Sequence, residues 1–168
     1  MTMSDWLSPN PPRITDMIWR IKMKENTVTY KSPNKEFRFE FVYEGEIRFG
    51  PPFFKLILNG KLVKGRIFGE AFKWHNESNF LALQEWLTTD YKKGPITSLA
   101  LIKLTTNESA RIATANNGFI EPVKFEENLI VYNKNYYQTV LKEEFEINIE
   151  EIKNWEAIDS FPSDVIFY

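Results

Sequence analysis

The sequence predicts an all-β, mainly antiparallel fold, and three observations support this. Apolar and polar residues alternate with a period of two in most apolar segments, which places them on opposite faces of a strand. Aromatic residues make up 15% of the chain and supply bulky side chains of the kind that strands favour. Turn signals recur about every ten residues, as in hairpin and meander units. With 168 residues, a single domain over 1–168 is expected.

Taken in order, the chain begins with an expected irregular arm over residues 1–15. Its prolines hold the residues that precede them in extended conformations. Alternating strands are predicted after it, and in the second of them Phe37, Phe39 and Phe41 share one face. The predicted strands are 16–24, 36–43, 53–58, 79–87, 96–104 and 128–132. The predicted turns, rich in Gly and Asn, are 32–35, 43–46, 59–61, 105–109, 115–118 and 126–128.

The segment 136–158 has two patterns. FEINI alternates like a strand, whereas EEIKNWEAI is compatible with a short amphipathic helix that turns Ile152, Trp155 and Ile158 inward. We therefore expect at most one or two short helices, near the C-terminus.

Three segments resemble one another: 21–30, 72–83 and 123–132. Each has an apolar residue, a lysine, a large apolar residue, a polar turn and an apolar strand, and Lys22, Lys73 and Lys124 are 51 residues apart. A shortened copy, 161–168, closes the chain.

Residues 74–82, WHNESNFLA, resemble the W-S-P-D-G-K-x-L-A turn and strand of bacterial β-propeller blades. Residues 98–113 are similar to the next two strands of a blade, and 122–132 to the start of the following one. Asn76, Glu77 and Ser78 stand where the blade turn has Pro, Asp and Gly. The resemblance implies blade-like antiparallel units. Because a blade takes about 40–45 residues and a ring needs at least four blades, an open blade-like or sandwich arrangement is expected.

Charge and composition argue against several partners. The 21 basic and 23 acidic residues are interspersed, so no basic stripe for nucleic acid is present. No cysteine occurs, no apolar run approaches the length of a membrane span, and the N-terminus lacks the pattern of a signal peptide. We expect a cytoplasmic bacterial protein that binds neither membrane nor nucleic acid.

Residues for catalysis or for cofactors are scarce. His75 is the only histidine and lies in a polar turn, and nearby Ser78 and Ser98 have no supporting base. Adjacent Glu pairs at 126–127, 143–144 and 150–151 point to opposite faces of a strand, so they cannot flank one bond. No phosphate loop or metal-ligand spacing is found. The sequence predicts a protein that is not an enzyme, with no catalytic, cofactor or metal residues.

Two surface stretches are candidates for recognition. The loop 87–95 directly follows a strand and carries Tyr and charged residues, which suit a protein contact. Within that strand, Glu85 shares a face with leucines and is either buried with a partner or at the strand end. The candidate partner-binding residues are Glu85, Trp86, Asp90, Tyr91, Lys92 and Lys93. The second stretch, 47–54, has two prolines that interrupt a strand, and a bulged edge strand explains it as well.

These observations predict a protein-binding domain without enzymatic activity, for example an immunity-type inhibitor of a bacterial toxin. One alternative is a small-ligand-binding protein or enzyme with a cavity between sheets, lined by Trp19, Phe37, Phe39 and Phe41. Another is a homo-oligomer that pairs edge strands such as VIFY, residues 165–168.

Overall fold

The predicted all-β, antiparallel fold is confirmed. The computed structural model describes residues 27–47, 50–136, 139 and 142–162. Their strands are β1 (Thr27–Lys31), β2 (Arg38–Glu46), β3 (Pro52–Leu58), β4 (Lys61–Val63), β5 (Ile67–Trp74), β6 (Phe80–Trp86), β7 (Ile96–Lys103), β8 (Glu108–Asn116), β9 (Gly118–Glu126), β10 (Leu129–Tyr136), β11 (Lys142–Asn148), β12 (Glu156–Ala157) and β13 (Ser160–Pro162). Two single 3-10 turns, η1 (Tyr91–Lys93) and η2 (Ile149–Glu151), are the only helical elements of these ranges. No helix in the described ranges has the length and apolar character needed to cross a membrane.

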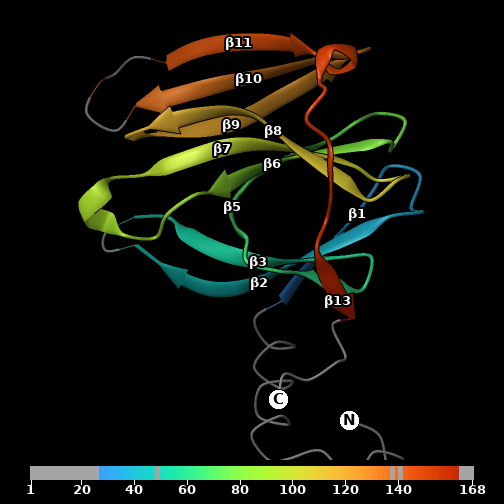
Figure 1. Ribbon diagram of the computed structural model, residues 1–168, viewed down its shortest axis with the longest axis horizontal. Helices are drawn as coiled ribbons and strands as arrows, with labels where there is room; N and C mark the ends of the chain where they lie inside the picture. Colours follow the sequence, from blue (N-terminus) through green and yellow to red (C-terminus); the bar gives the residue numbers. More distant parts are fainter. Residues whose placement is uncertain (1–26, 48–49, 137–138, 140–141, 163–168) are drawn as a thin grey trace, which may run out of the picture.

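Two antiparallel sheets form three layers (Figure 1). The ten-stranded sheet has the order β1-β2-β3-β5-β6-β7-β8-β12, with β4 and β13 attached beside β3, and the three-stranded sheet has the order β11-β10-β9. The large sheet folds over between β3 and β5, where the pairing register contains only Phe54 opposite Phe68. Strands β1–β3 therefore form one outer layer, β5–β8 the middle layer and β9–β11 the other outer layer.

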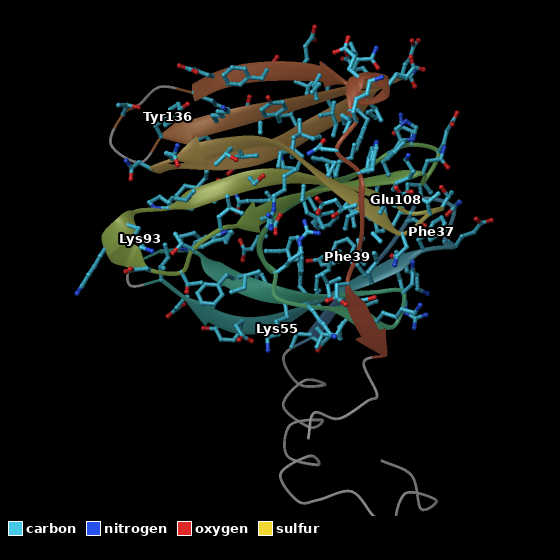
Figure 2. The ribbon with its side chains drawn as sticks, viewed as in Figure 1. Phe37, Phe39, Lys55, Lys93, Glu108 and Tyr136 are labelled. Carbon is cyan, nitrogen blue, oxygen red and sulfur yellow. The ribbon has the colours of Figure 1, made fainter. Side chains whose placement is uncertain are left out.

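An apolar core lies on each face of the middle layer. Between β1–β3 and the middle layer are Phe39, Phe41, Leu56, Leu58, Val63, Phe68, Leu81, Leu83, Ala100, Ile102, Leu104 and Ile158. Between the middle layer and β9–β11 are Ala82, Leu99, Leu101, Ala110, Ala115, Ile120, Phe125, Ile130, Tyr132, Ile149 and Ile152. Figure 2 shows Phe39 inside the fold. Strands β6 and β7 are buried on both faces, which explains why their sequences are nearly continuous apolar runs.

Most predicted turns are confirmed by their backbone. Asn59 and Gly60 have positive φ angles of 48° and 80°, which suit the two-residue hairpin between β3 and β4. Asn107 and Asn117 also have positive φ at the turns that follow β7 and β8. The predicted turn at 43–46 is wrong. These residues complete β2, and Gly45 is accommodated by a β-bulge in the pairing with β3.

The C-terminal region shows where the predicted helix fails. The first four residues of FEINI belong to β11 as predicted, and Ile149 begins η2. After η2 the chain is extended instead of helical over 152–158. The physical reason is that Ile152 packs in one core and Ile158 in the other, whereas a helix would present both on a single face. Residues 152–162, which we call the C-terminal strap, pair with β8 through β12 and with β4 through β13.

The internal repeat is realised as hairpins. Residues 72–83 lie in the β5–β6 hairpin and 123–132 in the β9–β10 hairpin, but the hairpins belong to different sheets. The described residues thus form an open, layered arrangement instead of separate propeller blades. The predicted arm 1–15, the predicted strand 16–24 and most of the repeat copies 21–30 and 161–168 lie outside the described residues.

Buried side chains connect β9 to the middle layer, because β9 belongs to the other sheet and does not pair with the strands of that layer. Gln84 Nε2 donates to the Ile120 carbonyl (2.8 Å), and the Thr97 hydroxyl donates to the Gly118 carbonyl (3.0 Å) and accepts from the Ile120 N–H (2.9 Å). Trp86 Nε1 donates to Gln84 Oε1 at 3.1 Å. We call Gln84, Trp86 and Thr97 the neutral cluster. It satisfies backbone groups of β9 that would otherwise be buried without partners.

Candidate functional site

Glu85 is a buried carboxylate near the end of β6. Its side chain lies on the opposite face of the strand from Trp86, toward the core between the middle layer and β1–β3, and the residue is 1% exposed. The sequence did not show whether Glu85 is buried, and the structure shows that it is. A buried charge needs partners, because desolvation of an unpaired carboxylate costs several kcal/mol.

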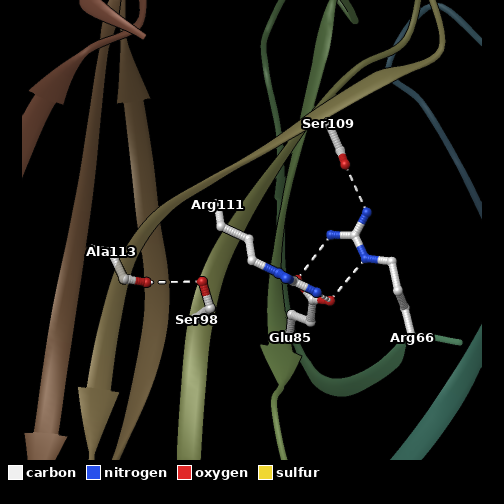
Figure 3. Close-up of polar contacts among 6 residues, drawn as sticks. All are labelled: Arg66, Glu85, Ser98, Ser109, Arg111 and Ala113. Atoms are coloured by element: carbon white, nitrogen blue, oxygen red, sulfur yellow. Dashed lines mark hydrogen bonds and ion pairs between the residues drawn. The ribbon is translucent and has the colours of Figure 1, made fainter. Parts of the chain in front are cut away.

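Two arginines supply these partners, each through a pair of parallel hydrogen bonds (Figure 3). Arg66 donates from Nε to Glu85 Oε1 (2.8 Å) and from Nη2 to Oε2 (2.8 Å). Arg111 donates from Nε to Oε2 (2.9 Å) and from Nη2 to Oε1 (2.8 Å). Each carboxylate oxygen therefore accepts two charge-assisted hydrogen bonds, in the fork geometry that arginine offers to carboxylates. We call these three residues the arginine–glutamate cluster.

The surrounding strands place the two arginines. Arg66 directly precedes β5, after Gly65 with φ of 64°, and its Nη1 also donates to the Ser109 hydroxyl at 2.6 Å. Arg111 lies two strands from Glu85, so its side chain must cross β7 over a distance of roughly 9–10 Å between strands. It crosses beside Ser98, opposite Glu85, and Ala100, opposite Arg111. Both residues are small, which leaves room for the guanidinium.

The electrostatics keep Glu85 ionised. Burial is the largest single influence and would raise the pKa of Glu85, but the hydrogen bonds and charges of Arg111 and Arg66 together outweigh it. The pKa of Glu85 is therefore below its ordinary value of 4.5. In return, the bonds to Glu85 raise the pKa of Arg111. An ionised carboxylate whose oxygens are all engaged can neither donate a proton nor attack a substrate, so Glu85 is not suited to catalysis.

A polar groove opens beside the cluster. It has a volume of about 390 Å³ and lies between the middle layer and the C-terminal strap. The lining residues are Lys64, Arg66, Ser109, Arg111, Asn154, Glu156, Ala157, Ile158 and Asp159. The side chain of Arg66 is 15% exposed and that of Arg111 is 55% exposed, so Arg111 is the member of the cluster that solvent and a ligand can reach.

The predicted recognition stretch divides into a buried and an exposed part. Glu85 and Trp86 are buried, and Trp86 packs against Phe53 and Phe119, so neither has surface for direct contact with a partner. Asp90, Lys92 and Lys93 are exposed around η1, and Figure 2 shows Lys93 projecting from the fold. Tyr91 begins η1, and its side chain is outside the description. That the loop 87–95 contacts a partner remains a prediction.

The described part of the second stretch, 47–54, leads into β3, which has neighbouring strands on both sides. Strand β3 begins at Pro52 and pairs with β2 on one side and with β5 and β4 on the other. Its aromatic residues are used for packing, since Phe53 contacts Trp86 and Phe54 stacks on Phe41. Pro51 thus lies in the connection from β2, and Pro52 is the first residue of β3.

His75 has a structural role. Its Nε2 lies 3.2 Å from the carbonyl oxygen of Glu127, and its ring packs edge-on against Phe80 and Phe125. It therefore links the β5–β6 turn to the β9–β10 turn. The preceding residue, Trp74, is half-buried and packs against Phe39.

The aromatic residues expected to line a cavity instead fill the space between layers. Phe39 and Phe41 are in mutual contact, with ring centroids 4.9 Å apart, and both contact Phe72. Phe37 packs against the same core, and Trp19 lies outside the described residues. Segment 165–168, the proposed oligomer edge, also lies outside them.

Sequence reasoning identified Glu85 but missed Arg66 and Arg111. Each arginine is a single charged residue near or within an apolar strand, which is an ordinary pattern for an exposed face. Their convergence depends on the registers of two hairpins, which no local pattern in the sequence reveals.

Comparison with known proteins adds no name to this site. No protein-family model, no curated protein and no solved structure matches the chain.

Proposed function

We propose that this chain is a non-enzymatic protein-binding domain that receives a carboxylate of its partner beside Arg111. The observation that carries the proposal is that Arg111 is held rigidly and yet is half-exposed. Two of its five N–H groups bond Glu85, which leaves three with no partner among the described residues. A guanidinium that is already oriented loses less conformational entropy when it binds, which favours recognition.

The charge balance supports an acidic ligand. Two guanidinium groups share one carboxylate, so the cluster carries one net positive charge. At the rim, Lys64 lies 3.8 Å from Asp159 and the two charges offset each other. Glu156 also lines the groove and acts on Arg111, so it weakens the field that a partner would meet.

The polar groups of the site support binding in preference to catalysis. Ser98 donates to the Ala113 carbonyl (2.9 Å) and Ser109 accepts from Arg66, so neither hydroxyl has a base beside it. His75, the only histidine, is engaged at the β5–β6 turn. An immunity-type inhibitor is one form of such a binding domain and stays a prediction from the sequence.

The test is capture of a stoichiometric partner from native lysate with matched charge variants. We expect Arg111→Gln to lose the partner, Glu156→Gln to retain more of it than the wild type, and the loop variant Lys93→Ala to be unchanged. Each variant is first shown to be folded by its unfolding midpoint. A partner that is lost with Lys93→Ala and kept with Arg111→Gln would place recognition at the loop 87–95 instead. Failure to capture any stoichiometric partner would contradict the proposal as a whole.

A further inference from the structure

A second polar site lies on the three-stranded sheet, apart from the arginine–glutamate cluster. Tyr132 on β10 packs in the core toward the middle layer. Because side chains alternate along a strand, the next residue, Asn133, points to the outer face of the small sheet. The residues opposite Asn133 share that face, and they are Glu121 on β9 and Glu144 on β11.

Asn133 is unusual because its amide oxygen has no hydrogen-bond partner among the described residues. The residue is only 6% exposed, and its Oδ1 is buried without any donor in the described part of the protein. Buried polar side-chain atoms are paired in the large majority of cases, because burial without a partner costs free energy. An oxygen in this position needs either a hydrogen-bond donor or a cation as its partner.

The two flanking glutamates have no direct polar contact among the described residues. Neither Glu121 nor Glu144 makes an ion pair or a side-chain hydrogen bond within the described residues. The nearest lysine on this face, Lys124, is one row away and is bound to Glu126 at 2.5 Å, and its charge also acts on Glu144. Directly opposed residues of an antiparallel pair have Cβ atoms about 4.5–5.5 Å apart, so both carboxylates can reach a point above Asn133.

We propose that Glu121, Asn133 and Glu144 bind a divalent cation, with Ca²⁺ as the preferred ion. Carboxylate and amide oxygens are the hard ligands that Ca²⁺ takes at about 2.3–2.6 Å in flexible geometry. No group of three or more His, Cys, Asp or Glu side chains suited to a metal occurs in the described ranges, so the third protein ligand is the amide. With three protein ligands, water completes the coordination and the affinity is low. Mg²⁺ is disfavoured because it demands near-ideal octahedral geometry.

The probe is CaCl₂ titrated into the full-length chain labelled with ¹⁵N, with amide resonances as the readout. We expect saturable shifts centred on Glu121, Asn133 and Glu144, with a dissociation constant on the order of 10⁻⁴–10⁻³ M, as in weak calcium sites. MgCl₂ should produce shifts that saturate at higher concentration. NaCl at matched ionic strength should produce none that saturate. Calcium shifts that do not saturate, or that NaCl reproduces, overturn the proposal and leave water as the partner of Asn133.

Matched variants separate coordination from general attraction of cations. Glu144→Gln should weaken calcium binding at least about tenfold, because it removes a charged ligand. Glu143→Gln, on the same strand but the opposite face, should leave it unchanged. Asn133→Asp should strengthen binding, and Asn133→Val, which removes the oxygen and keeps a strand-forming side chain, should abolish it. Equal weakening by Glu143→Gln and Glu144→Gln overturns the site. Retention of full affinity in Asn133→Val also does so.

Discussion

Strand β6 carries a polar cluster on each face, and the two clusters differ in what they leave available. On one face, the arginine–glutamate cluster is charged, and N–H groups of Arg111 that have no partner among the described residues face a groove. On the other, the neutral cluster uses its hydrogen bonds to join β9 to the middle layer. Both stabilise the same strand. Buried polar groups stabilise the fold on both faces, but only the arginine–glutamate cluster keeps exposed donors, and there we propose that a partner binds.

The largest effect should come from removing the central carboxylate. Glu85→Ala leaves two guanidinium groups without their shared anion, and Arg66 is mostly buried. We expect a loss of about 3–5 kcal/mol in the free energy of unfolding, the usual result of breaking a buried ion pair on one side. Urea denaturation measures it, with Glu143→Ala, an exposed glutamate, as the control. A loss no larger than that of the control would show that the cluster adds nothing to stability.

The next effect tests the neutral cluster through its packing. A Cβ on Gly69 would collide with Gln84 Oε1 and lie 2.7 Å from Trp86 Nε1. Gly69→Ala should therefore displace the Gln84–Trp86 hydrogen bond and cost about 3 kcal/mol, the upper end for overpacking. Urea denaturation followed by tryptophan fluorescence reports both stability and the surroundings of Trp86. Glu70→Ala, at the next and exposed residue, should change neither.

A smaller effect comes from a single hydroxyl of the neutral cluster. Thr97 is fully buried, and Thr97→Val keeps its shape while leaving the Ile120 N–H without its acceptor. The expected cost is about 2 kcal/mol, the desolvation of an unsatisfied buried group. Thr97→Ser retains the hydroxyl and should lose less. Hydrogen exchange at Ile120 is the second measurement, and unchanged protection in Thr97→Val would contradict the role of Thr97.

Acid should distinguish the charged cluster from the neutral one. Because the pKa of folded Glu85 is below 4.5, its contribution to stability is fully present above that value and is lost as pH falls through the lowered pKa of the folded state. The stability difference between wild type and Glu85→Gln should therefore shrink in this acidic window. The difference between wild type and Thr97→Val should not. Denaturation curves at stepped acidic pH measure both, and a pH-independent difference for Glu85→Gln would refute the linkage.

The smallest effect is expected in the exposed loop. Lys92 and Lys93 are exposed and make no ion pair in the described structure. Replacing both by alanine should change the free energy of unfolding by no more than about 0.5 kcal/mol. A larger loss in urea denaturation would mean that the loop, like the clusters, supports the fold.

Much of the fold could be predicted because its causes are local. Alternation in 36–43, 53–58 and 96–104 reports which side chains face a core, and each became a strand. The turn at 43–46 could not be predicted correctly, since the same Glu-Gly pair suits a hairpin and a bulge, and pairing with β3 chose the bulge. The helix predicted over 150–158 does not form, because Ile152 packs in one core and Ile158 packs in the other.

The same distinction applies to the two sites. Alternation and desolvation act within one strand, so the residues of β6 already indicate that Glu85 and Trp86 point to opposite faces and that a buried Glu85 needs a partner. The fold is needed to show that the partners are Arg66 and Arg111, and that Glu121 and Glu144 flank Asn133. These neighbours come from strand order and register, which depend on contacts between distant parts of the chain.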